Sequence, residues 1–138
     1  MSASQADGVI VFTDGAARGN PGPAGAGAYI EDEDGSVLDE SYRFLGRATN
    51  NVAEYEALIL GLERAVELGA RRVEVRADSQ LLVKQMRGEY RINSSPLRAC
   101  ARRARELVKN FETVEYVHIR RHLNEEADRL ANLAIDEA

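Results

Sequence analysis

Residues 9–45 read VIVFTDGAARGNPGPAGAGAYIEDEDGSVLDESYRFL, and the order of residue types in this stretch decides the fold. It opens with Val9–Thr13, a run of β-branched and aromatic residues that predicts a strand ending at Asp14. Gly15–Gly27 follows, rich in Gly, Pro and Ala, and its Gly-Asn-Pro-Gly segment at residues 19–22 is typical of a turn. The first strand is therefore expected to be short and to lead into a loop.

Two further strands are expected to complete an antiparallel meander. The second covers Gly25–Glu31, and Asp34-Gly35 then turns the chain into its hairpin partner at Val37–Leu45. Ser95 is expected to cap a later helix that begins at Pro96. This order of elements predicts an α/β fold with a mixed five-stranded sheet and helices on both faces. The later elements, of which the second and fifth are strands and the others helices, are expected over Asn51–Leu68, Arg71–Ala77, Ser79–Arg87, Pro96–Phe111, Thr113–Arg120 and Asn124–Asp136.

The composition suits one domain with a sizeable core. The chain has 138 residues, 44% of them hydrophobic and 30% charged. A single domain over residues 1–138 is expected, with a core at about 8–134 and a flexible segment at 1–7. No apolar run approaches the roughly 20 residues of a membrane span, and no signal-peptide pattern occurs, so a cytoplasmic location is the expectation. Cys100 is the one cysteine, which excludes an intrachain disulfide and a cysteine zinc site; it is expected in the core or at its boundary.

The net charge of −5 argues against a protein that grips nucleic acid by bulk positive charge alone. It leaves room for a nucleic-acid enzyme, since bound divalent cations can offset clustered carboxylates and basic groups can gather on one face. Most acids look like surface charge. Glu31–Asp34 is expected to form a solvated hairpin tip, and Glu56, Glu63 and Glu67 are expected to share the solvent face of their helix.

Four carboxylates occupy less ordinary positions. At about 100° per residue, Glu54 lies within the apolar arc of its helix, where an unpaired charge needs a cation, a proton or a water-filled cleft. Asp14 and Asp78 end the first and fourth strands, and sites gather at strand carboxyl ends in open α/β sheets. Asp128 lies at the edge of the apolar face of the last helix. Taken singly, Glu54, Asp78 and Asp128 are also compatible with boundary or structural positions.

Together these four carboxylates suggest a metal site. Oxygen ligands in a chain with one Cys and two His favour Mg²⁺ or Mn²⁺ over zinc. A carboxylate cluster can hold two such ions roughly 3.5–4 Å apart, one activating a water and the other stabilising the leaving oxygen. This is the chemistry of phosphodiester hydrolysis.

Five segments, spread over nearly the whole chain, contain the four carboxylates and several amide side chains. They are Thr13-Asp14-Gly15-Ala16, Gly19-Asn20-Pro21-Gly22-Pro23, Thr49-Asn50-Asn51-Val52-Ala53-Glu54, Ala77-Asp78-Ser79-Gln80 and Asn124-Glu125-Glu126-Ala127-Asp128-Arg129-Leu130-Ala131. Together they resemble the motifs of the type 1 ribonuclease H family. The resemblance implies a ribonuclease H-like fold and an endonuclease that cuts the RNA strand of RNA–DNA hybrids, leaving 5′-phosphate and 3′-hydroxyl ends. By position, Asp14, Glu54, Asp78 and Asp128 would be its catalytic, metal-binding carboxylates, with Mg²⁺ as the cofactor and Mn²⁺ as a substitute.

The resemblance also implies a set of contacts to the hybrid. Side-chain amides suit this task because they can donate and accept toward 2′-hydroxyls and minor-groove base edges. Arg47 and Thr49 resemble the positions that hold a phosphate of the DNA strand. Turn or cap duty stays an alternative for Asn20 and Asn51. The amide positions are Asn20, Asn50, Asn51 and Gln80.

The chain departs from many family members in two places. Where they carry a mobile histidine, this segment has Arg121, at the spacing of an Arg-bearing subgroup, and His122 is a second candidate. Arg121 would hold phosphate or product, because a guanidinium keeps its proton near neutral pH. The basic, tryptophan-bearing protrusion of some members is missing, since Gly88–Leu97 is short and the chain has no Trp. Basic residues of the next helix are expected either to add a binding surface or to form a solvated face: Arg98, Arg102, Arg103, Arg105 and Lys109.

The leading prediction is thus a metal-dependent, monomeric ribonuclease H. Activity on double-stranded RNA is left open. Two alternatives stay beside it: a non-catalytic hybrid-binding module, and another nuclease or strand-transfer enzyme of the same fold. The Asn-bearing motifs favour hybrid recognition over the second alternative. All four acidic positions are filled, which favours an enzyme over a binding module.

Overall fold

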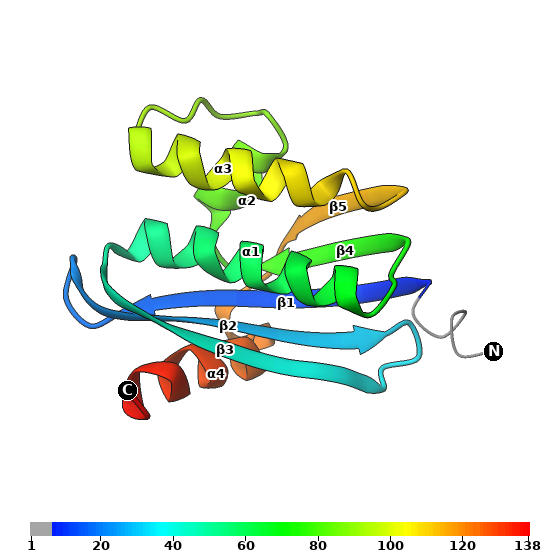
Figure 1. Cartoon of the computed structure of the whole chain (residues 1–138), viewed down its shortest axis with the longest axis horizontal. Helices are drawn as coiled ribbons and strands as arrows, with labels where there is room; N and C mark the ends of the chain where they lie inside the picture. Colours follow the sequence, from blue (N-terminus) through cyan, green and yellow to red (C-terminus); the bar gives the residue numbers. More distant parts are fainter. Residues whose placement is uncertain (1–6) are drawn as a thin grey trace.

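The computed structural model describes residues 7–138, which form a five-stranded sheet with helices on both faces (Figure 1). The strand order is β3-β2-β1-β4-β5; β1, β2 and β3 pair antiparallel, whereas β4 pairs parallel with β1 and β5. The predicted α/β class and mixed sheet are confirmed. The elements are β1 (Gly8–Ala17), β2 (Gly22–Asp32), β3 (Val37–Ala48), α1 (Asn50–Glu67), β4 (Arg72–Ala77), α2 (Gln80–Met86), α3 (Ser95–Val108), β5 (Thr113–His118), a 3₁₀ turn (Arg121–Leu123) and α4 (Glu125–Asp136).

Helices α1 and α4 cover opposite faces of the sheet. α1 packs on β1 and β2, α3 lies against the outer side of α1, and α4 covers β2 and β1 from the other face (Figure 1). Cys100 of α3 is buried with the core, as expected. The main core lies between α1 and the sheet and includes Val11, Ile30, Leu58, Leu62 and Val75. Among residues 7–138, no helix combines the length and the apolar character needed to cross a membrane. The flexible segment predicted at residues 1–7 lies almost wholly outside this range.

Much of the Gly-rich segment predicted as a loop belongs to strands, and only residues 18–21, which overlap the predicted Gly-Asn-Pro-Gly turn, lie between β1 and β2. β1 does not end at Asp14, which pairs across the ladder with Gly27 of β2. Gly25 and Gly27 of β2 lie directly under α4. A Cβ on Gly25 would come within 2.2 Å of the Ala131 carbonyl oxygen, and one on Gly27 within 2.4 Å of the Ala127 carbonyl oxygen. Glycine is needed because helix backbone rests on strand backbone, a contact with residues about 100 positions away that composition does not reveal.

Helix boundaries differ from the prediction where a side chain caps the helix. Thr49 caps α1, its Oγ1 accepting from the Val52 amide at 3.2 Å, so the helix begins at Asn50. α3 begins at Ser95 and is capped by Ser94, so the prediction that Ser95 is the cap is wrong. Both α3 and β5 also end earlier than predicted.

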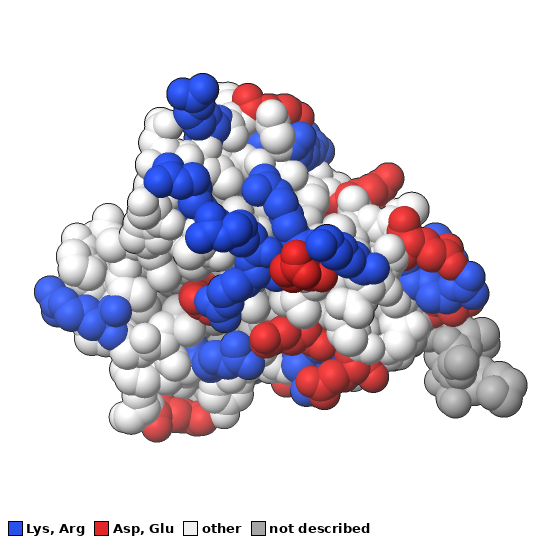
Figure 2. Space-filling model, turned by 45° about the horizontal axis from the view of Figure 1, so that its top comes forward, with Lys and Arg blue, Asp and Glu red and all other residues white. Residues whose placement is uncertain are grey.

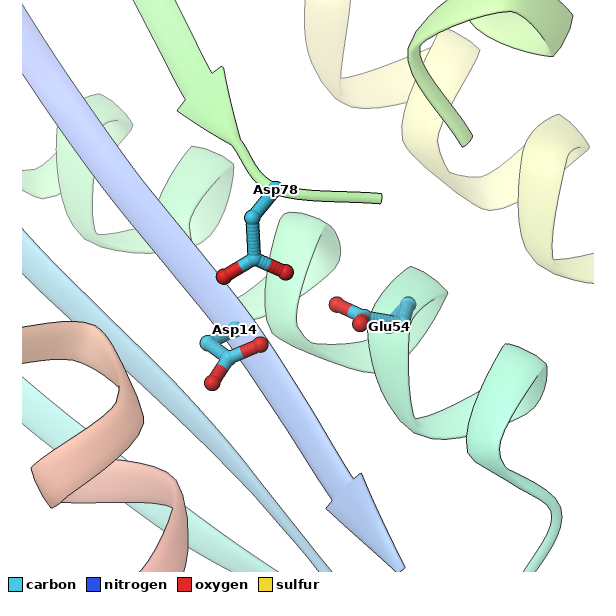
Figure 3. Close-up of side chains that lie close together, drawn as sticks. All are labelled: Asp14, Glu54 and Asp78. Carbon is cyan, nitrogen blue, oxygen red and sulfur yellow. The ribbon is translucent and has the colours of Figure 1, made fainter. Parts of the chain in front are cut away.

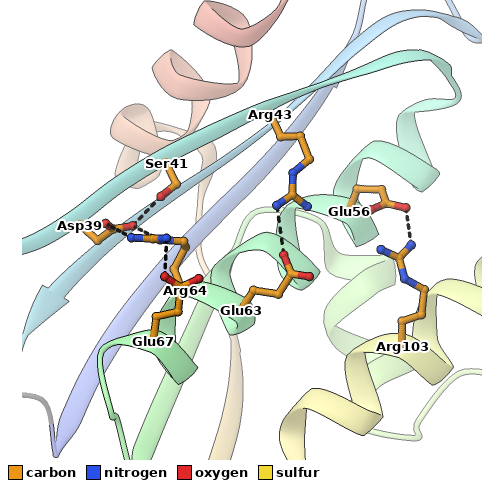
Figure 4. A network of polar contacts seen from close by, with 8 residues as sticks. All are labelled: Asp39, Ser41, Arg43, Glu56, Glu63, Arg64, Glu67 and Arg103. Atoms are coloured by element: carbon orange, nitrogen blue, oxygen red, sulfur yellow. Dashed lines mark hydrogen bonds and ion pairs between the residues drawn. The ribbon is translucent and has the colours of Figure 1, made fainter.

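The acidic side of α1 is not a plain solvent face. Its glutamates form ion pairs, two of which reach β3 and α3. Exposed ion pairs contribute roughly 0–1 kcal/mol each, so these two mainly fix how α1 sits against β3 and α3. The predicted solvent position is wrong for Glu56, whose side chain is 18% exposed. The pairs join Glu56 to Arg103 of α3, Glu63 to Arg43 of β3, and Glu67 to Arg64 within α1 (Figure 4).

Candidate active site

Three carboxylates from separate elements converge at the end of the central strands (Figure 3). Asp14 belongs to β1, Asp78 directly follows β4, and Glu54 lies early in α1. One oxygen of each side chain lies within 4.8 Å of the other two. The sheet register explains the convergence, because parallel pairing of Thr13 with Ala77 brings Asp14 and Asp78 to the same level.

Glu54 is positioned by the close crossing of α1 over β1. A Cβ on Gly15 would lie 2.2 Å from the Ala53 carbonyl carbon, so glycine is what lets the helix approach. The Gly15 amide then donates to Glu54 Oε1 at 3.0 Å. With 7% of its surface exposed, Glu54 is buried in the apolar arc, as its helical phase predicted.

The cluster carries more negative charge than its surroundings accommodate. Burial, followed by repulsion from Glu54 and Asp78, raises the pKa of Asp14 to about 9. Burial also raises the pKa of Glu54 to about 8, although the Gly15 amide and Arg121 oppose this shift. Near neutral pH the metal-free site therefore retains protons. A divalent cation would replace them and meet three hard oxygen donors, so the residues fit Mg²⁺ or Mn²⁺.

Asp14→Asn is expected to stabilise the metal-free protein. Because the folded-state pKa of Asp14 is raised, its contribution to stability is full below about pH 4. That contribution is lost as the pH rises toward about 9. The Asn side chain cannot ionise, so the variant does not lose this stability, and its melting temperature at pH 8 in EDTA should be higher by on the order of 5 °C. Calorimetry at pH 5 should show a smaller gain. A lower melting temperature of the variant at pH 8 would contradict the claim that ionised Asp14 destabilises the metal-free protein.

Asp128 approaches the cluster from the opposite face of the sheet. It lies in the first turn of α4, is exposed, and stands outside the tight group of three. Its negative charge adds to the causes that raise the pKa of Asp14. It also lines a hollow of about 520 Å³ with Arg121, His122 and Glu125. Both candidates for the position of the mobile histidine thus border this hollow.

The predicted contacts to nucleic acid gather largely around the start of α1. Asn20 lies in the β1–β2 turn, and its Oδ1 accepts a hydrogen bond from the backbone N–H of Asn50 at 3.0 Å. This bond joins the turn to the start of α1. Asn20 therefore has a structural duty, but its Nδ2 group is left to donate elsewhere. Thr49 caps the helix through its oxygen, which leaves its hydroxyl hydrogen free to donate. All six predicted positions are exposed: Asn20, Arg47, Thr49, Asn50, Asn51 and Gln80.

Basic side chains gather on the α3 side of the molecule, which Figure 2 brings forward. Arg98, Arg102 and Arg105 line a groove of about 280 Å³ together with Gln85 and Tyr90. The two other basic residues considered for this face are held by acids, Arg103 by Glu56 and Lys109 by Glu106. Three of the five residues thus share one concave surface.

One residue of the site was given no role from the sequence: Asn124 was placed at the start of the last helix and in one of the five motifs, but not in the site. Asn124 is 1% exposed and donates to the Asp78 carboxylate at 3.1 Å. The available signal was its place four residues, or about one helical turn, before Asp128.

Comparison with known sequences assigns the chain to a family. Residues 12–134 match the family model described as Reverse transcriptase-like. The chain is 47% identical over 130 residues to ribonuclease HI of Halobacterium salinarum, covering 94% of this chain. It is 35% identical over 147 residues to ribonuclease HI of Pseudomonas syringae pv. tomato, covering 95% of this chain and 94% of that protein. It spans 65% of the Halobacterium protein and 36% of the mycobacterial relatives that it matches.

Solved structures agree with this assignment. The crystal structure of RNase H1 from Halobacterium salinarum NRC-1 superposes with a TM-score of 0.92 at 46% identity, covering 95% of this chain and 99% of that one. LC11-RNase H1 in complex with an RNA/DNA hybrid gives 0.89 at 45% identity, covering 94% and 97%. The family model, the relatives and the solved structures agree, and the chain belongs to the type 1 ribonuclease H family.

Proposed function

We propose that the chain is an endonuclease that hydrolyses the RNA strand of RNA–DNA hybrids and leaves 5′-phosphate and 3′-hydroxyl ends. The observation that carries this proposal is the convergence of Asp14, Glu54 and Asp78 within 4.8 Å, in a setting that raises the pKa of the first two. The proposal is supported by the 45% identity to LC11-RNase H1, which was solved in complex with an RNA/DNA hybrid.

The four carboxylates would hold the cation and aim it at the scissile phosphate. Bound Mg²⁺ or Mn²⁺, expected as two ions, would polarise the phosphate and lower the pKa of the attacking water. Asp14, Glu54 and Asp78 supply the rigid base, because all three lie on regular elements or directly after one. Asp128 is exposed on α4 and closes the site from the other face of the sheet.

Arg121 is proposed to hold the phosphate or the product at the mouth of this site. It is exposed, borders the same hollow as Asp128, and its charge already acts on Glu54. A guanidinium stays protonated near neutral pH, so it neutralises charge and does not transfer protons. His122, which borders the same hollow, is the alternative residue for this role.

The turn and helix start around Asn20 and Asn50 are proposed to recognise the hybrid. The free Nδ2 group of Asn20 and the exposed amides of Asn50, Asn51 and Gln80 can donate to and accept from 2′-hydroxyls and base edges. Arg47 and the Thr49 hydroxyl are proposed to bind a phosphate of the DNA strand.

The test is a cleavage assay with labelled RNA–DNA hybrid in Mg²⁺, in Mn²⁺ and in EDTA. RNA-strand products in either metal and none in EDTA would establish the activity. Single-stranded RNA, double-stranded RNA and double-stranded DNA in the same buffers define the substrate class. Hybrid binding without cleavage would replace the proposal by a non-catalytic binding module, and cleavage of DNA would point to another nuclease of this fold.

Arg102→Ala is expected to weaken hybrid binding about 3–10-fold, because an arginine that contacts a phosphate contributes roughly 1 kcal/mol or more at moderate salt. Arg102 lines the α3 groove and makes no ion pair or hydrogen bond within residues 7–138. Lys109→Ala is the control, since Lys109 is the C-cap residue of the same helix but pairs with Glu106. Fluorescence anisotropy at two salt concentrations measures both. Equal affinities of the two variants would remove the α3 groove from the binding surface.

A cytoplasmic location and a monomeric state complete the proposal. Light scattering coupled to size-exclusion chromatography measures the oligomeric state directly. A stable dimer would overturn it.

A further inference from the structure

Asn124 stands where helices carry capping residues, but its side chain does not cap α4. Asn is a preferred N-cap residue because its side-chain oxygen usually accepts from the second or third helical amide. Among residues 7–138, no such bond forms at this helix. The side chain is instead turned inward and is 1% exposed. A stabilising cap is therefore absent from α4, although the right residue type is present.

The Asn124 amide group bridges the ends of two strands. Its Nδ2 donates to the Thr13 carbonyl oxygen at 2.9 Å and to Asp78 Oδ2 at 3.1 Å. Thr13 immediately precedes Asp14, so the bridge joins the backbone of β1 to the carboxylate that follows β4. Both partners accept hydrogen bonds, so a side chain rotated by 180° would place Asn124 Oδ1 against the oxygens of Thr13 and Asp78, which repel it. The two contacts thus fix the orientation of the side chain.

This orientation leaves Asn124 Oδ1 buried without a hydrogen-bond partner in the described part of the chain. A buried acceptor in this state opposes folding, and in a native protein it calls for an explanation. Helix capping does not explain it, because capping would use this oxygen. The contact with Asp78 does explain it, because Nδ2 must point at the Asp78 carboxylate and this places Oδ1 where it has no partner.

We propose that Asn124 is a positioning residue that holds Asp78 in the orientation required for cation binding, an inference that rests on the proposed function. A neutral amide suits the task, since a cationic side chain at this point would compete with the metal for Asp78. The Asn124 backbone carbonyl oxygen also accepts from the Asp128 backbone amide at 3.1 Å, so the residue that holds Asp78 stands one turn before Asp128 at the start of α4.

Asn124→Ser separates positioning from structure. Ser is also a favoured N-cap residue, but its shorter side chain does not span the distance to Asp78. The melting temperature in EDTA should stay close to that of the wild type. The dissociation constant for Mg²⁺, measured by calorimetry without substrate, should rise about 10–100-fold, and kcat should fall by a similar factor at nearly constant KM. Ala104→Gly, at a buried position of α3, is the control that loses stability but keeps metal affinity.

Wild-type Mg²⁺ affinity in folded Asn124→Ser would overturn the proposal. If the variant does not fold, ¹⁵N-labelled wild-type protein decides. Both side-chain amide protons of Asn124 should exchange slowly and shift as Mg²⁺ is added, whereas those of exposed Asn110 should do neither. Fast exchange at Asn124 without a shift would also overturn it. Wild-type protein that binds Mg²⁺ but cleaves no hybrid would refute the proposed function. The Mg²⁺ affinity of Asn124→Ser and the amide protons of Asn124 would still test the positioning role.

Discussion

Asp14→Asn should lower kcat on an RNA–DNA hybrid by at least about 10³-fold, well beyond the roughly 10–100-fold cost of losing a contact that only supports a ligand. Asp14 is 6% exposed, and the negative charges of Glu54, Asp78 and Asp128 all raise its pKa. The amide keeps the shape of the side chain but removes the negative charge that would hold a divalent cation. Single-turnover cleavage with saturating hybrid and Mg²⁺ measures the loss.

Asp34→Asn is the matched control for this variant. It removes the same charge from the exposed β2–β3 hairpin tip and should leave kcat unchanged. The higher melting temperature expected for Asp14→Asn in EDTA excludes unfolding as the cause of inactivity. A variant at Asp14 with more than about a tenth of wild-type activity would be incompatible with a metal-ligand role.

Gly15→Ala should lower the free energy of unfolding by about 3 kcal/mol or more, the upper range for overpacking a rigid site. The new Cβ would lie 2.2 Å from the Ala53 carbonyl carbon and 2.3 Å from the Glu54 backbone nitrogen. These are backbone atoms of α1, so the helix itself has to move. Because Glu54 moves with it and its 3.0 Å bond to the Gly15 amide is disturbed, kcat should fall even where the variant is fully folded.

Gly35→Ala is the control for a glycine whose replacement meets open space. Gly35 has φ of +89°, and no atom lies within 4 Å of the position that a Cβ would take there. Alanine at this position should therefore cost only about 1 kcal/mol and leave activity intact. Urea unfolding compares the two variants. Equal stability losses would show that the contact between β1 and α1 is looser than the structure indicates.

The order of the elements was predictable because hydrophobic periodicity and turn residues are local signals. The extent of β1 and β2 was not, because residues 15–17 and 22–24 look like loop residues although they belong to the strands. The capping of α3 by Ser94 was missed for a similar reason. Two adjacent serines precede Pro96, and the residue pattern does not tell which of them has the extended backbone of a cap.

The buried charge of the site was predictable from helical phase alone at Glu54. Alternation along β4 did not indicate that Asp78 faces the cluster, because this residue lies in the bend after the strand. Asn124 was hidden by its own residue type, since an Asn before a helix is ordinarily a cap. Contacts that depend on register between distant segments, such as that of Asn124 with Thr13, cannot be obtained from local patterns.

The bridge from Asn124 to Thr13 spans 111 residues, and the contact of Arg18 with Asn132 spans 114. Contacts so distant along the chain form slowly, because the entropy of closing a long loop is lost before they contribute. Docking of α4 is therefore expected among the late steps of folding, and it brings in both Asp128 and the Asn124 side chain that donates to Asp78. A partly folded molecule would thus lack the complete set of candidate metal ligands, so the proposed cleavage of RNA would be possible only in the native state.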